Sequence, residues 1–423
     1  MDLALYHPEF GYYSRGQGLG AAGDFATSVH LCADFGELIA VQLAEMWQQL
    51  DRPARFDLIE MGAGQGILAG DILRYLRRTD PDCYRSIHYR IVEKSVRLRQ
   101  IQQQQLQEFQ ADIPILWCEL ADIAEGSIVG CCLSNELLDA FPVHRVRLTE
   151  GTLAEIYVTY DETAPEAGWV EVTGDVSTPE LLNYLREAGL AQGDRSVGSR
   201  SEGKLPSAQN PANPPPETSP EASARVTNCR ILPDYPEGYT SEVNLAAKDW
   251  VMAIARILDR GYVLTIDYGY DTDRYYSPYR RDGTLNCYSH HHHHPDPYQN
   301  LGLQDITAHV DFGTIERWGE TFGLEPLGRT HQALFLMALG LGDRLSGLGQ
   351  TGSRGQDDRA GEPVGNTTAT AQDIVQVFQR HQVLRDLIDP QGLGGFQVLI
   401  QYKGDRSVRE RSTLTGLSTP TMP

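Results

Sequence analysis

The chain has 423 residues, of which 41% are hydrophobic and 22% are charged. This composition is typical of a globular protein with one large domain or two of ordinary size. The formal net charge of −21 argues against binding to a nucleic-acid backbone; it serves solubility and also favours a basic partner, such as a protein segment that carries arginine. No uninterrupted apolar run of about 18 residues occurs, so we expect no stable membrane insertion.

The first residues, MDLALYHPEF, have neither the basic and apolar regions of a secretory signal nor the Arg-rich character of a transit peptide. The seven cysteines are scattered, and the adjacent pair Cys131 and Cys132 lacks the spacing of a metal knuckle. Reduced thiols in a cytoplasmic protein are therefore expected. The internal run His290 to His294 has no partner ligands at defined spacing, so it is interpreted as a loop and no metal site is expected.

Strand and helix patterns alternate along most of the chain. Short apolar runs predict strands at 56–61, 88–93, 113–118, 127–134, 261–269 and 396–402, the third and fourth of them buried. Helical spacing of apolar residues predicts helices at 68–78, from Ser95 to about 109, at 244–258 and at about 371–388. Repeated β–α units predict an α/β fold of the Rossmann-like type, with a mostly parallel sheet and helices on both faces. Ligands of such sheets bind at the carboxyl ends of the strands.

Two segments, 192–225 and 346–371, contain almost no large apolar residue, which predicts disordered insertions. The pattern resumes after each of them, so we interpret them as surface insertions into one fold. The remaining parts are a substrate or lid segment at 1–50, a first domain part at 51–191 with an inserted hairpin and helix after about residue 143, a second part at 226–345, a final helix and strand at 372–403, and a tail at 404–423.

The first predicted strand runs directly into a glycine cluster, EMGAGQG at 60–66. Glycine lets the chain turn sharply and approach a ligand closely, because no Cβ is in the way. An acidic residue two places before the first glycine is the habit of S-adenosylmethionine (SAM) sites. A dinucleotide fingerprint needs a shifted frame that starts two residues beyond the strand, so NAD is the weaker alternative. The expected cofactor residues here are Glu60, Gly62, Gly64 and Gly66.

Polar residues also follow the next three strands. Glu93 ends the second strand, where a carboxylate can accept both ribose hydroxyls of SAM or NAD. Glu119 follows the third strand, near the expected place of the adenine amine. Asn135 follows the fourth strand, where it can bond the amino-acid end of the cofactor.

Glu136 and Asp139 come next and are three residues apart, so one helical turn would place both carboxylates on one face. A pair of carboxylates suits a guanidinium, which presents a rigid fork of donors. A solvated helix start that favours acidic residues explains the pair equally well.

Several ordered motifs resemble those of the MidA-like family, which includes a mitochondrial complex I assembly factor that is a protein-arginine methyltransferase. The resemblance covers nearly the whole chain outside the two insertions. The motifs are GYY at 11–13, GDFATS at 23–28, FGE at 35–37, LIEMGAGQG at 58–66, IVEKSVRLRQ at 91–100, NELLDAFPVHRV at 135–146, EVNLAAKDW at 242–250, LTIDYGY at 264–270, DGTLNCY at 282–288 and GLQDITAHVDF at 302–312. One departure is that Val29 and His30 stand where the family usually has Pro-Glu.

The resemblance implies a class I SAM-dependent methyltransferase. It also implies symmetric ω-N-methylation of an arginine in a protein substrate, a subunit of the NADH dehydrogenase complex. Carboxylates can orient a guanidinium and accept its proton, so Glu136 and Asp139 are the first choice for catalysis, with His309 as a further candidate. The expected substrate-binding residues are Asp24, Thr27, Ser28 and Asp267.

Two other functions are compatible with the same residues. A SAM-binding assembly factor with little or no turnover would keep the glycine cluster and Glu93, and a methyltransferase for another substrate would keep the whole cofactor site. An NAD-dependent oxidoreductase needs the shifted glycine frame and gives no role to the NELLDAFP string.

Overall fold

The structure is a computed structural model that describes residues 1–15, 27–163, 168–192, 229–231, 235–289, 292–350, 371–405 and 413–420. The chain forms two compact units. The first comprises Met1–Val143, Ala246–Tyr275 and Leu285–Pro423, and the second comprises His144–Leu245 and Tyr276–Thr284. The predicted insertion at 192–225 lies outside the described residues except for its first residue, as do most of the predicted loop at 346–371 and His290 of the histidine run.

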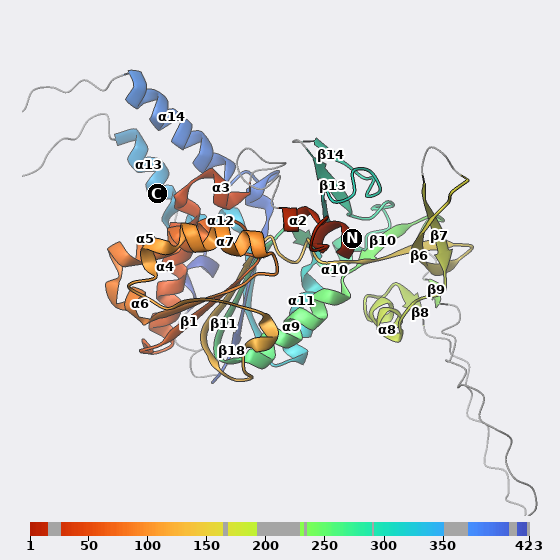
Figure 1. The fold of residues 1–423 in the computed structure, drawn as a ribbon, viewed down its shortest axis with the longest axis horizontal. Helices are drawn as coiled ribbons and strands as arrows, with labels where there is room; N and C mark the ends of the chain where they lie inside the picture. Colours follow the sequence, from red (N-terminus) through yellow and green to blue (C-terminus); the bar gives the residue numbers. More distant parts are fainter. Residues whose placement is uncertain are drawn as a thin grey trace, which may run out of the picture. The chain divides into compact units, whose positions relative to one another are not determined.

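The first unit is built on a seven-stranded sheet in the order β17-β18-β11-β4-β1-β2-β3 (Figure 1). Its strands are β1 Phe56–Met61, β2 Ile87–Val92, β3 Ile115–Cys118, β4 Ile128–Asn135, β11 Leu258–Asp267, β17 Glu325–His331 and β18 Gln397–Lys403. The five strands from β11 to β3 pair in parallel, and β18 is antiparallel to both of its neighbours. The predicted mostly parallel sheet is confirmed.

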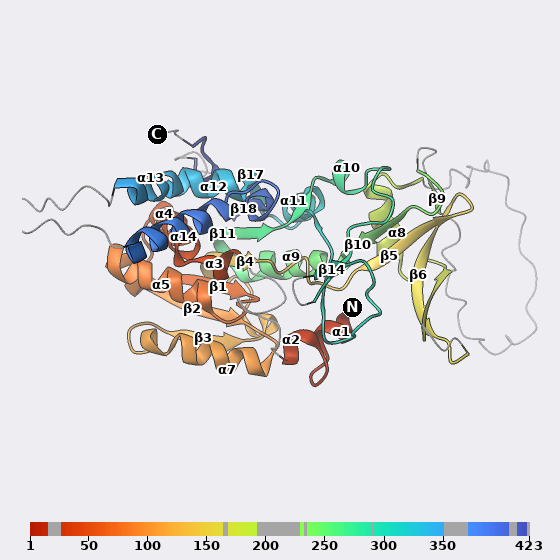
Figure 2. The same cartoon turned by 90° about the horizontal axis from the view of Figure 1, so that it is seen from above.

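Helices cover both faces of this sheet. On one face, Leu58 of β1 and Leu264 of β11 share a core with α4 (Ala33–Gln49) and α5 (Ile67–Thr79). On the other face, the indole N–H of Trp250 in α9 (Leu245–Ile257) contacts the sulfur of Met61 at 3.2 Å. The view from above shows α5 and α7 (Val96–Gln105) beside β1, β2 and β3, with β11 and β18 farther along the sheet (Figure 2).

Local sequence signals explain where several helices begin. The hydroxyl of Ser95 accepts the N–H of Leu98 at 3.3 Å, which caps α7 as predicted. The carboxylate of Asp311 accepts the N–H of Thr314 and caps α11 (Phe312–Thr321) in the same way. Such caps satisfy helix N–H groups that have no partner within the helix.

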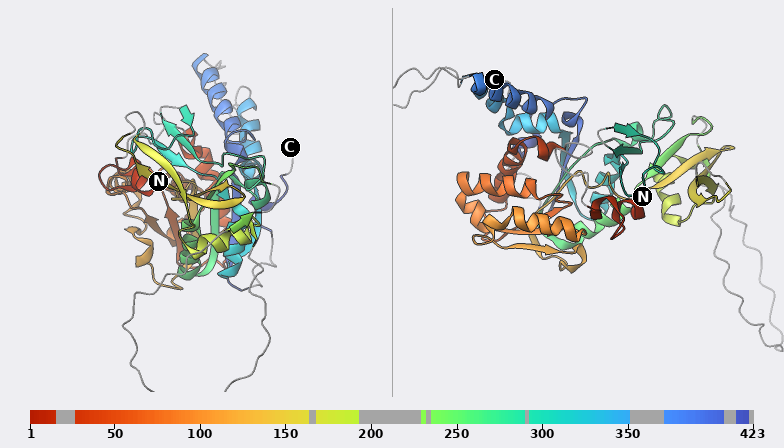
Figure 3. Two further views of the ribbon diagram at one scale, coloured as in Figure 1. Left: turned by 90° about the vertical axis from the view of Figure 1, so that its right-hand side faces the viewer. Right: turned by 45° about the horizontal axis from the view of Figure 1, so that its top comes forward.

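The remaining helices of the first unit are short, except for two near the carboxyl end. These two, α13 and α14, lie side by side (Figure 3), and Arg344 of α13 and Arg380 of α14 both pair with Asp34 of α4. The helices are α1 Asp2–Tyr6, α2 Tyr12–Arg15, α3 Ser28–Leu31, α6 Pro81–Ser86, α10 Thr272–Tyr275, α12 Gln332–Leu336, α13 Gly342–Gln350 and α14 Ala371–Asp386. Smaller strands are β12 Gly269–Tyr270, β13 Asn286–Ser289, β14 His292–His294, β15 Asp305–Thr307 and β16 Val310–Asp311.

The second unit is an antiparallel sheet with one described helix. Its strand order is β10-β5-β6-β9-β8, and β7 pairs with β6. The elements are β5 His144–Thr149, β6 Thr152–Tyr160, β7 Trp169–Gly174, α8 Pro179–Glu187, β8 Ala191–Gln192, β9 Cys229–Ile231 and β10 Thr240–Val243. β5, β6, β7 and α8 lie in the stretch for which the sequence predicts an inserted hairpin and helix, whereas β9 and β10 lie in the range predicted as the second domain part, 226–345.

Some predicted elements were wrong in detail. β3 is an edge strand rather than a buried one, and Leu116 in it is 56% exposed. The predicted helix 244–258 ends one residue early, because Leu258 already pairs with Ile128 of β4. β17 was missed: its sequence, EPLGRTH, contains Pro, Gly and four polar residues and has no apolar alternation.

The two carboxyl-terminal loops were also predicted too long. Residues 346–350 belong to α13. In the tail, the N–H of Gly416 donates to the side-chain oxygen of Gln42 in α4 at 2.9 Å, and Leu414 is buried. This part of the tail is therefore packed on the first unit.

Candidate active site

The predicted site residues meet at the carboxyl edge of the sheet in the first unit. β1 pairs in parallel with both β2 and β4, so Glu60 lies level with Ile91 on one side and with Leu133 on the other. β11 continues this alignment and places Ile266 beside Asn135. The loops after β1, β2, β4 and β11 therefore start at the same edge, where ligands of parallel sheets bind.

The glycine cluster forms a turn between β1 and α5. Gly62, Gly64 and Gly66 all have positive φ angles, of 69°, 52° and 78°. A Cβ built on Gly64 meets no atom of the described residues within 4 Å, so this glycine borders open space. A left-handed glycine next to open space is the cradle that a closely approaching cofactor needs.

Glu93 lies next to this turn at the end of β2 and is buried. One of its oxygens accepts the N–H of Ser95 at 2.8 Å, and the other accepts the amide of Gln102 at 3.1 Å. Burial raises the pKa of Glu93, and these hydrogen bonds oppose the shift. The backbone N–H of Lys94 also bonds this carboxylate. A carboxylate has about four acceptor positions, so about one remains for a ribose hydroxyl.

The other two predicted acidic cofactor residues have different surroundings. Glu60 is buried within the sheet and accepts the hydroxyl of Tyr89 at 2.8 Å. Burial, and then the nearby charge of Glu93, raises the pKa of Glu60 to about 7. Glu119 is exposed and pairs with Arg99, and its backbone N–H donates to Asp122. Glu60 therefore lies in the core at the base of the turn, whereas the Glu119 side chain is occupied at the surface.

The loop after β4 is held by Asp267 at the end of β11. One oxygen of this fully buried carboxylate accepts three successive N–H groups, those of Leu137, Leu138 and Asp139, at 3.2, 2.9 and 3.3 Å. The other oxygen of Asp267 accepts the backbone N–H of the next residue, Tyr268, at 2.9 Å. These bonds favour a positioning role for Asp267 over direct contact with a substrate.

The helical turn predicted for Glu136 and Asp139 is wrong. Glu136 has a φ angle of +50°, and the loop from 136 to 140 is not helical. The carboxyls are nevertheless close enough that the charge of Asp139 raises the pKa of Glu136. The Asp267 hydrogen bonds bring them together instead of an α-helix.

Burial dominates the electrostatics of this pair. Burial, and then the charge of Asp139, raises the pKa of Glu136 to about 8, and burial raises that of Asp139 to about 6. Burial, and then the charges of Asp139 and Glu136, raise the pKa of Asp267. Within the described part of the chain, no salt bridge involves any of these three residues. The site is therefore acidic and suited to a cation.

Asn135 is the last residue of β4 and directly precedes residues 136–140, which we call the acidic loop. Its amide donates to Glu136 at 3.1 Å. Its side-chain oxygen is buried and meets no hydrogen-bond donor among the described residues, as is also the case for Oδ1 of Asp139. An open acceptor at the end of β4 matches the predicted contact with an amino group of the cofactor.

The remaining predicted residues lie around this loop or outside the described ranges. The backbone N–H of Ser28 bonds the Glu136 carboxyl, while the Ser28 hydroxyl is buried against Gln332. Thr27 instead contacts His30, at 2.8 Å between Oγ1 and Nδ1. Asp24 lies outside the described residues.

His309 lies between two tyrosine rings. Its ring centroid is 5.1 Å from that of Tyr268 and 5.1 Å from that of Tyr270. The preceding residue, Ala308, donates its N–H to the backbone oxygen of Asp139 at 2.9 Å. This contact places His309 one residue from the acidic loop.

The sequence prediction missed a fourth carboxylate and several tyrosines. Asp305 is fully buried, accepts the hydroxyl of Tyr13 at 2.9 Å and contributes to the raised pKa of Glu136. Tyr288 of β13 lies opposite Asp305 of β15. Burial is the main cause that raises the pKa of Tyr288, and the charges of Asp139, Asp305 and Glu136 raise it further. Tyr6 donates to the backbone oxygen of Ala140 at 2.8 Å. For Tyr13, Tyr288 and Asp305, the available signal was their place in the GYY, DGTLNCY and GLQDITAHVDF strings.

Comparison with known proteins agrees with this geometry. Residues 38–330 match the model of a family described as "Putative S-adenosyl-L-methionine-dependent methyltransferase". The chain belongs to this family. Its cofactor is SAM, and the open cradle at Gly64, the acceptor oxygens of Glu93 and the open acceptor of Asn135 fit that molecule. The prediction of SAM rather than NAD is confirmed.

Curated relatives and a solved structure extend the match over most of the chain. The chain is 29% identical over 361 residues to the mitochondrial protein arginine methyltransferase NDUFAF7 homolog of Drosophila melanogaster, covering 80% of this chain and 70% of that protein. It is 27% identical over 370 residues to human NDUFAF7, covering 82% and 70%. A crystal structure of a Burkholderia thailandensis protein with bound S-adenosyl-homocysteine superposes with a TM-score of 0.72 at 25% identity, covering 99% of this chain and 88% of that one.

The expectation of a cytoplasmic protein is wrong, because these curated relatives are named as mitochondrial proteins. Among the described helices, none has both the length and the apolar character needed to cross a membrane.

Replacement of Gly64 by Val tests the cradle. Val at a φ angle of 52° is strained by about 1–3 kcal/mol, and its branched side chain would occupy the open space where the cofactor approaches. We expect the dissociation constant of S-adenosyl-homocysteine, measured by calorimetry, to rise by at least ~100-fold, the equivalent of about 2.7 kcal/mol.

Gly126 supplies a matched control for this variant. It also has a positive φ angle, of 59°, and a Cβ on it meets nothing within 4 Å, but it precedes β4 at the opposite edge of the sheet. Gly126→Val should lower the melting temperature comparably and leave cofactor affinity intact. Equal affinities for the two variants would remove Gly64 from the site.

The raised pKa values predict that the ligand-free protein loses stability as the pH rises. Glu136, with a pKa of about 8, and Asp139, with a pKa of about 6, hold protons in the folded state that the unfolded chain releases near pH 4. The stability they contribute is complete below about pH 4 and is lost as the pH rises through the folded pKa values. Glu136→Gln should therefore raise the melting temperature above that of the wild type at pH 8.5 and leave it nearly equal at pH 4.

Scanning calorimetry without cofactor at both pH values measures this difference. Glu125→Gln, at an exposed position, should change neither curve. A Glu136→Gln curve that coincides with the wild type at pH 8.5 would show that Glu136 titrates normally.

Proposed function

We propose that the chain is a protein-arginine methyltransferase that forms symmetric ω-N-methylated arginine on a subunit of an NADH dehydrogenase complex. The family establishes SAM-dependent methyl transfer. The names of the relatives, protein arginine methyltransferases, support arginine as the acceptor. The resemblance of the GDFATS and NELLDAFP motifs to MidA-like proteins supports the NADH dehydrogenase subunit as the substrate.

One observation carries the proposal: Glu136 and Asp139 lie close together, and no salt bridge among the described residues neutralises either of them. Burial penalises the charged form of both carboxylates, and the charge of Asp139 adds to the penalty on Glu136, so each takes up a proton more readily than usual. A bound guanidinium would remove that cost, because its delocalised charge and planar donors match two carboxylates. The proposed complement of this site is therefore a cationic, planar group.

Tyrosine rings supply the second half of such a site. Tyr268 lies beside Asp139, and the pKa of Tyr288 is raised by the charges of Asp139 and Glu136 after burial. Tyrosine faces attract guanidinium groups, which stack on them more readily than ammonium groups do. This combination favours arginine over lysine as the substrate residue.

Bound SAM supplies a methyl group on a positively charged sulfur. The site has to present one guanidinium nitrogen, localise the positive charge on the other two, and accept the proton that this nitrogen loses as the N–C bond forms. Glu136 and Asp139 can orient the guanidinium, and either can take the proton directly or through water. Most of the acceleration then comes from positioning and from fixed charge.

Neutral substitutions of the acidic pair test this role. Glu136→Gln and Asp139→Asn keep the size of each side chain and remove its charge. We expect methyl transfer to an arginine peptide to fall by at least ~10²-fold in each variant, as is typical when one electrostatic or acid–base group is lost. Affinity for S-adenosyl-homocysteine should stay within about threefold, since Glu93 and the Gly64 turn are unchanged.

Glu125→Gln is the control for the removal of a surface charge and should retain full activity. Unaltered methylation by a double variant, Glu136→Gln with Asp139→Asn, would exclude the pair from catalysis. Attention would then move to His309 and Asp305, which flank the same loop.

Mass spectrometry of a co-expressed NADH dehydrogenase subunit tests the substrate. We expect a mass gain of two methyl groups on one arginine, with fragment ions that lose monomethylamine, as symmetric dimethylation requires. Loss of dimethylamine would indicate asymmetric dimethylation. A wild-type protein that binds SAM tightly but modifies no arginine would contradict the proposal and favour an assembly factor with little or no turnover.

A further inference from the structure

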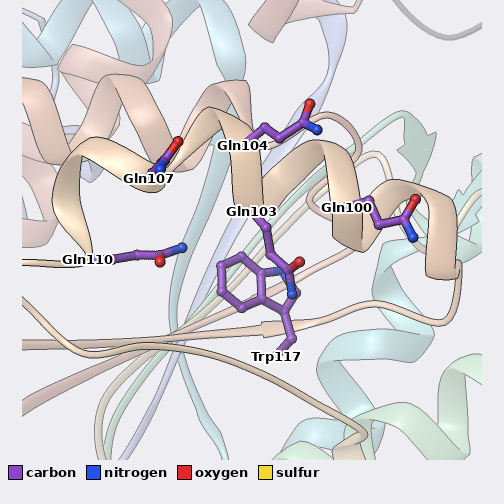
Figure 4. Close-up of a pocket in the computed structure, with 6 residues that line it drawn as sticks. All are labelled: Gln100, Gln103, Gln104, Gln107, Gln110 and Trp117. Carbon is purple, nitrogen blue, oxygen red and sulfur yellow. The ribbon is translucent and has the colours of Figure 1, made fainter.

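Helix α7 and the turn after it carry a run of glutamines, and one of them differs from the others in its surroundings. Five of these side chains, together with Trp117 of β3, line a surface hollow of about 450 Å³ (Figure 4). The five are Gln100, Gln103, Gln104, Gln107 and Gln110. Gln102, by contrast, is fully buried and faces the cofactor turn.

The side-chain amide of Gln102 forms hydrogen bonds to residues at or after the ends of three strands, β1, β2 and β3. Its nitrogen donates to the backbone oxygen of Gly64 at 2.8 Å and to Glu93 Oε2 at 3.1 Å. Its oxygen accepts the indole N–H of Trp117 at 2.9 Å. An indole can only donate and a backbone oxygen can only accept, so the chemistry of these neighbours fixes which end of the amide faces which group.

Gln102 also packs against the next glycine of the turn. A Cβ built on Gly66 would lie 3.3 Å from Cγ of Gln102, so the α7 side chain determines how far the turn can move towards it. The same residue thus sets the position of the glycine turn and the orientation of the Glu93 carboxylate. The glycine turn and Glu93 are both predicted parts of the cofactor site.

We propose that Gln102 is a positioning residue of the cofactor site, which fixes the Gly64 turn and the Glu93 carboxylate at the spacing that the nucleoside of SAM requires. It touches neither the methyl group nor the acidic loop. The inference rests on SAM binding and is independent of the arginine substrate. Failure of arginine methylation would therefore leave it standing.

Gln102→Met tests the proposal, because methionine has the same length and no hydrogen-bonding amide. Two hydrogen bonds to the site are lost, one of them to a charged group, so we expect the dissociation constant of S-adenosyl-homocysteine to rise on the order of tenfold or more. The enthalpy of binding should become less favourable. Calorimetry on the full chain measures both, and the melting temperature without ligand reports whether the variant folds.

Gln104→Met is the matched control, on the same helix with an exposed side chain that contacts only the surface hollow. It should bind S-adenosyl-homocysteine as the wild type does. A purely structural Gln102 would lower the melting temperature of the Met variant and leave the dissociation constant of the folded fraction unchanged. That outcome would overturn the proposal.

A second variant gives a readout that loss of packing cannot imitate. Gln102→Glu places a carboxylate against the Gly64 carbonyl and Glu93, so affinity should be lowest at pH 8 and recover when acid protonates the new side chain. The association constant of S-adenosyl-homocysteine for this variant, divided by that for Gln104→Glu, should rise towards one as the pH falls from 8 to 5.5. A ratio that stays constant over this range would contradict a hydrogen-bonding role for Gln102.

Discussion

The carboxylate of Asp267 is buried at the end of β11, and one of its oxygens accepts three successive backbone N–H groups of the loop after β4. Leaving a buried N–H group without a partner costs about 1–3 kcal/mol, so these bonds stabilise the loop in this conformation. The arrangement lets Glu136 adopt a left-handed backbone. The same hydrogen bonds allow Asp139 to be buried close to Glu136. The acidic site therefore depends on a hydrogen-bonded turn that spans two strands.

This construction is unfavourable for the ligand-free protein. Burial raises the pKa values of Glu136, Asp139 and Asp267, and the charges of neighbouring carboxylates raise those of Glu136 and Asp267 further. A fold selected for stability alone would replace such a group with apolar side chains. Its presence at the edge where the cofactor binds is an example of a site that is maintained at the expense of stability. The sheet and its two helical layers supply the stability that the loop lacks.

Much of the fold could be predicted from the sequence because its signals are local. The run FDLIEM is followed at once by glycines, and β1 ends where the prediction placed it. The Ser95 cap is likewise encoded within four residues. Elements that depend on distant partners were missed. EPLGRTH becomes β17 only because β18 offers it a neighbour, and β3 is an edge strand although its apolar sequence resembles a buried one.

The candidate site shows the same difference between features that are encoded locally and features that depend on distant residues. The glycine turn, Glu93 and Asn135 could be proposed from the sequence because each lies at or directly after the end of a strand, and the parallel pairing brings these ends to one edge. The helical turn predicted for Glu136 and Asp139 was wrong, since a hydrogen-bond acceptor 128 residues away decides the local backbone. Tyr13 and Asp305 are 292 residues apart and meet through hydrogen bonds from the Tyr13 hydroxyl to both carboxylate oxygens, which no local pattern encodes. In the glutamine run, only the packing of α7 distinguishes Gln102 from its neighbours.

The position of β18 in the sheet has a consequence for how the protein is made. This strand, Gln397–Lys403, lies between β11 and β17, and the turn around Gly416 packs on α4 near the start of the chain. During translation at about 5–20 residues per second, the first strands emerge from the ribosome tens of seconds before β18 does. Until then, β11 has an open edge that can pair with other chains. The nascent protein therefore exposes this strand edge until β18 has been synthesised.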